Sequence, residues 1–314
     1  MRTDFVDRTG SYRRELLAHC YRMLGSIHDA EDLVQETYLR AWRSYDAYDP
    51  GRASLRTWLY RIATNACLTA LDQRSRRALP SALGSPGSDP EGHLSADLPE
   101  VTWLEPWPDI ATSDPAAITE SRESLRLALV AALQYLPARQ RGILLLRDVL
   151  GWPASEVSEL TGLSVPAVHS AVRRARAQLE RVMPTDDGPP ALSDTEQQQL
   201  LNRYARAFET ADIETLLRLL TVDATWEMPP VPDWFSGREA IGRLIVAQCG
   251  AMNGGGRMVR TSANGQPAFA LYVNGRAYSL QVLTLTGAGI AKANDFHDLR
   301  VFAPFGLPLE LAGR

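Results

Sequence analysis

The stretch from Pro153 to Val182 places the strongest constraint on this chain, because its pattern predicts two helices joined by a tight turn. The first helix is expected over 154–161 and ends at Gly162, and Ser164 stands where the second helix needs an N-cap. Along the second helix, apolar residues recur on one stripe at helical spacing: Val165, Val168, Ala171, Val172, Ala175, Leu179 and Val182. This pattern predicts a helix-turn-helix.

The flanks of that stripe indicate what the second helix can bind. They carry small or hydrogen-bonding residues and arginines: Ala167, His169, Ser170, Arg173, Arg174, Arg176 and Arg181. A buried stripe with such flanks suits a helix that enters the major groove of duplex DNA. The alternative is an ordinary core helix with a solvated basic face. By itself the segment predicts duplex-DNA binding and little more.

Length and composition exclude several other classes. A chain of 314 residues can form two or three domains, each with its own core. No apolar run approaches the roughly 18 residues that cross a bilayer, and the segment from Met1 to Asp4 lacks the apolar stretch of a secretory signal. We therefore expect a cytoplasmic protein with no membrane partner. The cysteines are scattered and the histidines do not fall at metal-ligand spacing, so no metal or cofactor is predicted.

The net charge of −4 is unevenly distributed along the chain. Between 52 and 78 there are six arginines and one acidic residue, and between 165 and 183 four arginines and one acidic residue. Acidic residues gather instead over 29–36 and, without any lysine or arginine, over 79–119. Such segregation is typical of a DNA-binding protein that also has a protein partner.

Hydrophobic periodicity divides the chain into three folded blocks. The first, within 1–78, is helical by its three apolar stripes: Leu16, Leu17, Cys20, Tyr21 and Leu24; Ala30, Leu33, Val34, Thr37 and Ala41; and Leu55, Trp58, Leu59, Ile62, Ala66 and Ala70. Residues 79–118 are rich in proline, glycine, serine and acids, which predicts an extended linker with little structure of its own. Residues 119–184 form a second helical block that ends in the helix-turn-helix.

A short linker over 185–193 leads to the third block, 194–314, which has a different character. Two helical patterns come first, and strand-like runs follow at 224–228, 258–263, 267–273, 277–285 and 290–302. Asn274-Gly275 between two of these runs is a strong hairpin signal. Helices followed by an antiparallel meander predict an α+β domain.

Several motifs in the two helical blocks resemble a known family. The stretches from Asp29 to Trp42 and from Thr57 to Asn65, with the run Arg74-Ser75-Arg76-Arg77, resemble domain two of extracytoplasmic-function (ECF) sigma factors of the sigma-70 family. Leu136-Pro137-Ala138-Arg139-Gln140-Arg141 and the helix-turn-helix look like sigma domain four. The resemblance implies a transcription initiation factor without catalysis of its own. Its implied partners are promoter DNA and the RNA polymerase core enzyme, including the clamp coiled coil and the flap.

The resemblance also implies a role for particular residues. The clamp coiled coil would bind an acidic helix face: Asp29, Asp32, Gln35 and Glu36. The minus-ten element, held as separated strands, would contact Arg56, Arg61, Asn65, Arg74, Arg76 and Arg77. The minus-35 duplex would contact Ala167, His169, Ser170, Arg173, Arg174 and Arg176. Within this last set we expect His169, Ser170 and Arg173 at base edges, and Arg174 and Arg176 at phosphates.

The third block resembles the SnoaL-like, NTF2-type cone that follows domain four in some of these sigma factors. The segments 226–230, 234–241 and 253–257 carry this match. In such fusions the extra domain is thought to replace a separate anti-sigma protein. Two tryptophans in a polar linker are costly to leave in water, so we expect them to dock on a folded surface. The expected interdomain regulatory residues are Trp103, Leu104, Glu105, Pro106, Gly254, Gly255 and Gly256. A small ligand inside the cone also stays open.

The expected fold is therefore multidomain: two all-α domains followed by an α+β SnoaL/NTF2-like cone. Two other function classes stay open at this point. A helix-turn-helix regulator with a small-molecule-sensing cone explains the second and third blocks but leaves the stretch from Asp29 to Trp42 without a role. A ketosteroid-isomerase-type enzyme fused to a DNA-binding domain would use Asp295, His297 and Asp298 as acid–base groups, although the sequence positions no partner for His297.

Overall fold

The computed structural model describes residues 3–72, 76–95, 98, 100–109, 125–183, 192–249 and 256–311. The chain divides into two compact units. The first comprises Met1–Arg77 and Ala116–Pro184, and the second comprises Ala78–Pro115 and Thr185–Arg314. The two predicted sigma-like blocks thus form one unit, and most of the predicted linker belongs with the third block. Among the described residues, no helix is long and apolar enough to cross a membrane.

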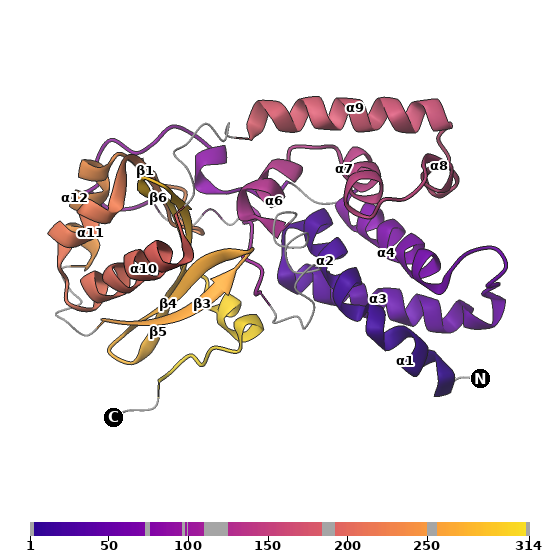
Figure 1. Cartoon of the computed structure of the whole chain (residues 1–314), viewed down its shortest axis with the longest axis horizontal. Helices are drawn as coiled ribbons and strands as arrows, with labels where there is room; N and C mark the ends of the chain where they lie inside the picture. Colours follow the sequence, from indigo (N-terminus) through magenta and orange to yellow (C-terminus); the bar gives the residue numbers. More distant parts are fainter. Residues whose placement is uncertain are drawn as a thin grey trace. The chain divides into compact units, whose positions relative to one another are not determined.

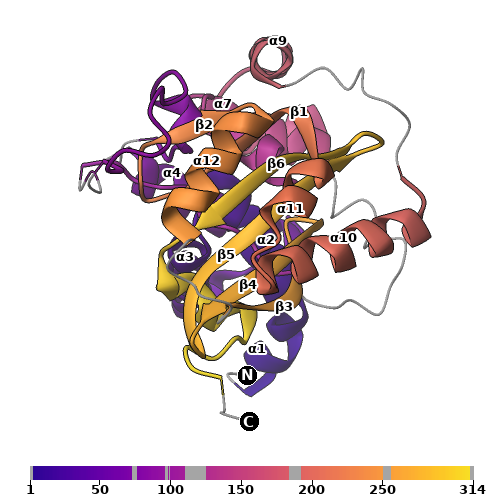
Figure 2. The same ribbon diagram turned by 90° about the vertical axis from the view of Figure 1, so that its left-hand side faces the viewer.

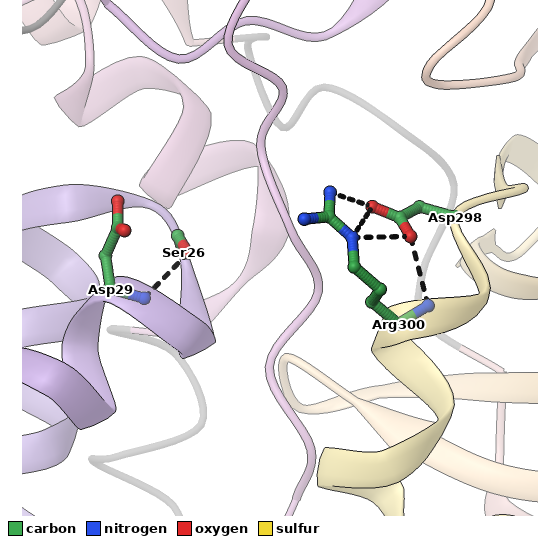
Figure 3. A network of polar contacts seen from close by, with 4 residues as sticks. All are labelled: Ser26, Asp29, Asp298 and Arg300. Atoms are coloured by element: carbon green, nitrogen blue, oxygen red, sulfur yellow. Dashed lines mark hydrogen bonds and ion pairs between the residues drawn. The ribbon is translucent and has the colours of Figure 1, made fainter.

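The first unit is helical (Figure 1). Its elements are α1 (Thr3–Thr9), η1 (Gly10–Tyr12), α2 (Arg13–Leu24), α3 (Ile27–Ser44), η2 (Tyr45–Ala47), α4 (Leu55–Leu71), α6 (Leu127–Leu133), α7 (Ala138–Leu144), the π-helical turn η4 (Leu145–Val149), α8 (Ala154–Thr161) and α9 (Val165–Val182). Side-chain caps begin the long helices, because a side-chain oxygen satisfies an amide that has no partner within the helix. Ser26 Oγ accepts from Asp29 N at 3.1 Å at the start of α3 (Figure 3), and Ser54 Oγ accepts from Thr57 N at 3.0 Å at the start of α4.

The buried faces of α2, α3 and α4 pack against one another and follow the predicted stripes in most places. Leu16, Cys20 and Tyr21 of α2 are fully buried. On α4 the pattern differs from the prediction, because Trp58 and Ile62 are only partly buried, while Tyr60 and Thr64 on the adjacent face are buried. The buried face of α4 is thus turned from the predicted stripe, and the reason is a second packing partner, described next.

Helix α4 also packs against the region that follows α6. Gly142 of α7 lies against the Met23 and Thr64 side chains, so that a Cβ at this position would meet Met23 Cε at 3.5 Å. The Tyr60 and Trp152 rings meet edge to face with centroids 6.2 Å apart, and Trp152 is buried. Tyr60 therefore packs on this partner and not toward solvent.

The helix-turn-helix has the predicted form. Helix α8 ends at Gly162 with φ of 68°, a left-handed conformation that glycine adopts without strain, and Ser164 Oγ caps α9. Val168, Ala171, Val172 and Ala175 are buried along α9. Val165 and Val182 at its two ends are more than a third exposed, so the buried stripe is shorter than predicted.

The second unit is an α+β domain, as predicted. Its elements are η3 (Pro80–Ala82), α10 (Asp194–Glu209), α11 (Ile213–Leu219), β1 (Leu220–Glu227), β2 (Trp234–Ser236), α12 (Arg238–Cys249), β3 (Gly256–Ala263), β4 (Gln266–Val273), β5 (Arg276–Thr286), β6 (Gly289–Phe296) and η6 (Leu299–Phe305). The strand order is β2-β1-β6-β5-β4-β3, with β1 and β6 parallel and the other pairs antiparallel. Figure 2 shows α10, α11 and α12 on one face of this sheet.

The sheet confirms the hairpin signal and corrects the last strand. Asn274 and Gly275 have φ of 51° and 78° and connect β4 to β5. The run predicted over 290–302 ends as a strand at Phe296, and 299–305 forms the 3₁₀ helix η6. The Asp298 side chain caps this helix by accepting from Arg300 N at 3.0 Å (Figure 3), which ends the extended conformation.

The segment 78–109, which we call the strap, packs within the second unit and is not an extended linker over its described part. Ala78 pairs with Trp103, and Pro108 pairs with Ala263 of β3. Trp107 N donates to Asn264 Oδ1 at 2.8 Å, and Trp107 O accepts from Asn264 N at 2.9 Å. Leu104 and Trp107 are buried, as expected for side chains that dock on a folded surface. Composition suggested disorder here because the few apolar anchors are diluted by polar residues.

Burial predicts a specific pH dependence for the first unit. His19 is completely buried on α2 beside Arg22, with Nε2 3.0 Å from Thr64 Oγ1, and burial lowers its pKa from 6.5 to about 3. The unfolded chain therefore binds a proton more readily between these two pKa values, so stability falls as the pH falls below 6.5. From pH 7.5 to 5.5 the expected loss is about 1.4 kcal/mol.

This prediction is checked by urea unfolding of the wild type and His19→Gln at both pH values. The variant is expected to be less stable at pH 7.5 but to lose this part of the pH slope. The exposed His169 supplies the matched control, because His169→Gln should keep the wild-type slope. An equal slope in all three proteins would contradict the assignment to His19.

Candidate nucleic-acid interface

The predicted polymerase-binding residues of α3 divide into two groups. Asp29, in the first turn, forms an ion pair with Arg77, and both side chains are mostly buried. Glu36 pairs with Arg40 one turn away, with 2.7 Å between Oε1 and Nε. Asp32 and Gln35 are exposed and lie one turn apart. Of the four predicted residues, Asp32 and Gln35 are therefore the two that α3 exposes.

The exposed face of α3 continues into two apolar residues that the sequence prediction left out. Leu39 is 50% exposed and Trp42 is 40% exposed, and with Asp32 and Gln35 they recur at spacings of three or four residues. They therefore share one helix face. Sequence spacing alone could have predicted that Leu39 and Trp42 are exposed, since neither residue falls on the buried stripe of Val34, Thr37 and Ala41.

Two of the predicted minus-ten residues meet at a hollow of about 840 Å³ in the first unit. Its lining is Ala47, Tyr48, Asp49, Arg52, Ala53, Trp58, Arg61, Ile62, Asn65 and Glu159. Arg61 and Asn65 were predicted. The Tyr48 and Trp58 rings, which were not predicted, lie with centroids 5.0 Å apart. A hollow that combines an aromatic pair, arginines and an amide offers stacking, charge and hydrogen bonds together.

The other predicted minus-ten residues are engaged within the first unit. Arg56 Nε donates to Glu15 Oε2 at 2.8 Å, and this hydrogen bond raises the pKa of Arg56. Arg77 is held by Asp29, as described above. The Arg76 guanidinium lies 4.1 Å from the centroid of the Tyr135 ring. Arg74 lies outside the described residues. Neither pairing nor stacking is readable from sequence, because the partners are 41 or more positions away.

The predicted minus-35 residues lie on α9. His169, Arg173 and Arg176 line a second hollow of about 410 Å³, together with Arg147, Asp148, Val172, Ala177 and Glu180. Arg174 is exposed but does not line this hollow, and Ala167 and Ser170 are partly exposed. The Arg176 guanidinium makes two hydrogen bonds of 2.8 Å to the Asp148 carboxylate. Sequence reasoning did not find Asp148, which comes from the preceding π-helical turn η4.

The predicted interdomain residues lie mostly within the strap. Leu104 and Pro106 are buried, and Trp103 and Glu105 are partly exposed. Gly254 and Gly255 lie outside the described residues, and Gly256 begins β3. A Cβ at Gly256 would meet the Phe208 carbonyl oxygen at 3.6 Å and Leu271 Cδ1 at 3.9 Å.

The cone contains a buried polar row that the sequence did not reveal. Tyr204 OH donates to Gln281 Oε1 at 2.8 Å, and Gln281 on β5 is directly opposite Asp295 on β6. Among the described residues, the buried atoms Ser279 Oγ, Gln281 Nε2 and Asp295 Oδ1 have no hydrogen-bond partner. His297 Nε2 lies 3.3 Å from Asp295 Oδ2. His297 therefore has a partner that sequence reasoning missed. Burial lowers its pKa, and Asp295 more than offsets this, so that the pKa of His297 is raised.

Of the three candidate acid–base groups, Asp295 and His297 form a pair. Asp298 belongs to a different contact, a forked ion pair with Arg300 (Figure 3). Among the described residues, no group of His, Cys, Asp and Glu side chains forms a metal site.

The helical first unit contains matches to two regions of the sigma-70 class. Residues 10–77 match Sigma-70 region 2, and residues 126–179 match Sigma-70 region 4. The match over α2, α3 and α4 accounts for the part of the chain that a simple helix-turn-helix regulator would leave unexplained.

Similar full-length proteins give the finer class. The chain is 51% identical to the ECF RNA polymerase sigma factor SigG of Mycobacterium tuberculosis over 315 aligned positions, which cover 98% of this chain and 85% of SigG. It is 29% identical to SigJ of the same species over 70% of this chain and 64% of SigJ. The chain belongs to the ECF RNA polymerase sigma factors. It is thus a transcription initiation factor and not an enzyme.

The fold of the whole chain has a counterpart among solved structures. The crystal structure of SigJ from M. tuberculosis aligns with a TM-score of 0.65 at 23% identity, covering 97% of this chain and all of that one. This agreement confirms the expected architecture of helical sigma domains followed by an α+β domain.

Proposed function

We propose that this sigma factor captures the minus-ten element at the hollow of Tyr48, Trp58, Arg61 and Asn65. Promoter opening exposes bases that are no longer stacked, and such bases bind where aromatic faces and hydrogen-bonding groups lie together. Arg52 and Arg61 supply positive charge for the adjacent backbone phosphates. The single observation that carries the assignment is that this hollow unites the predicted Arg61 and Asn65 with an aromatic pair.

We further assign α9 to the minus-35 duplex and the exposed face of α3 to core polymerase. Asp32 and Gln35 offer polar contacts to the clamp coiled coil, and Leu39 and Trp42 extend the same face with apolar area. An apolar centre beside polar groups is common in protein interfaces. The flap is the expected site for domain four. We place these contacts in the cytoplasm, where core enzyme and promoter DNA meet.

The cone is proposed to modulate initiation through the strap. The strap is part of the covalent connection between α4 and α6, so it limits how far domains two and four can separate. Its hydrogen bonds to the cone at Asn264, Gly265 and Trp234 support this role, because a strap held on the cone is shorter than a free chain of the same length.

The test compares run-off transcription with purified core enzyme by the whole chain and by residues 1–190. The shorter chain loses the sheet on which the strap packs, so promoter output is expected to change by at least about threefold while start-site selection persists. Equal output from both chains would reject modulation by the cone. Loss of start-site selection by the whole chain would instead reject the promoter assignments above.

We also propose that a small ligand binds inside the second unit and takes part in this modulation. The unpartnered atoms of Ser279, Gln281 and Asp295 support a ligand that carries both hydrogen-bond donors and acceptors. An Asp295→Asn variant, assayed beside the two chains above, is expected to shift output toward that of 1–190. Wild-type transcription output from this variant would show that the polar row has no part in regulation.

A further inference from the structure

Arg176 of α9 is held in one orientation by an acidic residue outside the recognition helix. Its Nε donates to Asp148 Oδ2 at 2.8 Å and its Nη2 donates to Asp148 Oδ1 at 2.8 Å. Two parallel hydrogen bonds of this kind fix the plane of the guanidinium as well as its position. The Arg176 side chain is 61% exposed and that of Asp148 is 28% exposed, so the pair faces solvent with the arginine outermost.

The backbone around Asp148 is well anchored. Asp148 belongs to the π-helical turn over Leu145–Val149, a rare conformation that often marks functional positions. Leu145 and Leu146 of this turn are buried, and Arg147 donates to the Trp152 carbonyl. Because its neighbours are fixed in this way, the position of Asp148 does not depend on Arg176, and Asp148 can hold the Arg176 side chain in one orientation.

The pair lies in the hollow beside the reading face of α9. His169, Arg173 and Arg176 contribute its basic side, one helical turn apart, and Asp148 and Glu180 contribute carboxylates. A phosphate that approaches the guanidinium of Arg176 therefore also approaches the Asp148 carboxylate, and like charges repel. A base edge does not meet this repulsion, because its acceptor atoms belong to a neutral group. The free N–H groups of Arg176 suit such acceptors, of which O6 and N7 of guanine are the commonest partners of arginine.

We propose that Asp148 is a positioning residue that directs Arg176 to a base edge of the minus-35 element and away from the phosphate backbone. This inference rests on the proposed placement of α9 in the major groove. It replaces our expectation from sequence that Arg176 meets a phosphate, which took no account of a carboxylate partner.

The experiment measures promoter binding by holoenzyme formed from the whole chain and core enzyme. Each minus-35 base pair is varied in turn, and affinity is measured over a range of salt concentrations. Asp148→Asn and Asp148→Ala free Arg176 to reach a phosphate, so the slope of log K against log salt is expected to steepen by up to about 0.9. Discrimination at one base pair is expected to fall by about fivefold or more.

The double variant Asp148→Ala/Arg176→Ala distinguishes a base contact by Arg176 from a phosphate contact. We expect it to keep the wild-type salt slope and to lose the same discrimination, because the wild-type pair brings no net charge to the DNA. A slope that is shallower by about 0.9 in the double variant would show that Arg176 contacts a phosphate and would overturn the proposal. Unchanged slope and discrimination in both Asp148 single variants would overturn it as well.

Two controls keep these outcomes distinct from other failures. Glu214→Ala removes an exposed carboxylate from a similar pair with Arg218 in the cone, and it should change neither readout. Thermal unfolding of each variant shows whether domain four still folds, and only the slope and the base-pair profile test positioning. If wild-type holoenzyme does not discriminate among minus-35 base pairs, the promoter assignment of α9 itself fails.

Discussion

Replacing Arg141 with alanine is expected to lower the free energy of unfolding of the first unit by about 3 kcal/mol. The Arg141 side chain is 3% exposed, and its guanidinium donates to Gln134 Oε1 at 2.6 Å, to Gln134 O at 3.2 Å and to Leu136 O at 3.1 Å. It also donates to the Met23 carbonyl. Truncation would leave these buried acceptors without a donor, and an unsatisfied buried polar group costs about 1–3 kcal/mol.

The hydrogen bond to the Met23 carbonyl connects Arg141 of domain four to domain two. Met23 is next to the last residue of α2, and helix carbonyls at this position have no partner within the helix. Arg141 supplies that partner from α7, next to the place where Gly142 packs on Met23 and Thr64. Domain two and domain four are thus joined by a hydrogen bond that stabilises both. We expect Arg141→Ala to destabilise domain four and also to weaken its packing against domain two.

The measurement is urea unfolding of the whole chain followed by helical circular dichroism. Arg40→Ala is the matched control, because Arg40 makes an exposed pair one turn along α3, and such pairs contribute at most about 0.5 kcal/mol. Arg141→Lys should recover only part of the loss, since one ammonium group cannot reproduce the planar fork of donors. A loss below about 1 kcal/mol for Arg141→Ala would mean that the buried hydrogen bonds of Arg141 contribute little to stability.

Local patterns predicted the elements of this protein better than the contacts among them. The helix-turn-helix and the Asn274-Gly275 hairpin follow from spacing and turn chemistry within a few residues, and both are present. Arg141 stood in a motif that indicated domain four, yet nothing local identified Met23, 118 positions earlier, as its partner. The strap differs from prediction for the same reason, since its structure depends on a sheet that begins more than 100 residues later.

In the candidate site, too, the residues were predicted better than the contacts that they make. Arginine content predicted a basic segment over 52–78, but Glu15 engages Arg56 and Asp29 engages Arg77, while Arg61 is at the hollow. Long-range ion pairs decide which arginines stay available, and sequence reasoning has no access to them. The aromatic pair could be predicted in part, because Tyr48 precedes the arginine-rich segment 52–78 and Trp58 lies within it. Trp58 was placed in the core since its spacing also fits the apolar stripe.

One buried carboxylate joins the strap to the sheet, and its replacement in Glu227→Ala is expected to have the second large effect. Glu227 at the end of β1 is fully buried. It pairs with Lys292, the one lysine of the chain, and accepts a hydrogen bond of 2.8 Å from Ser81 Oγ of the strap. Removing the carboxylate leaves Lys292 without its counter-charge and Ser81 without its acceptor. We expect the second unit to lose about 3 kcal/mol of stability, which is typical when one partner of a buried pair is removed.

Release of the strap is the more specific part of this prediction. Limited proteolysis should cut Glu227→Ala within 78–109 at least about tenfold faster than the wild type, because opening by about 1.4 kcal/mol more easily already raises the open population tenfold. Glu214→Ala, at an exposed pair in the same unit, should leave both stability and cleavage unchanged within about 0.5 kcal/mol.

A double variant tests whether the unpaired charge is the cause. Glu227→Met with Lys292→Met replaces both charged groups by apolar side chains of similar length, and substitutions of this kind are often neutral or stabilising. Stability should therefore recover in large part, but cleavage of the strap should stay fast, since Ser81 still lacks its acceptor. If the double variant is as unstable as Glu227→Ala, loss of packing and not charge determines the effect. If the strap is then protected, Ser81 does not hold it, and the contacts at Trp107 and Asn264 must be sufficient.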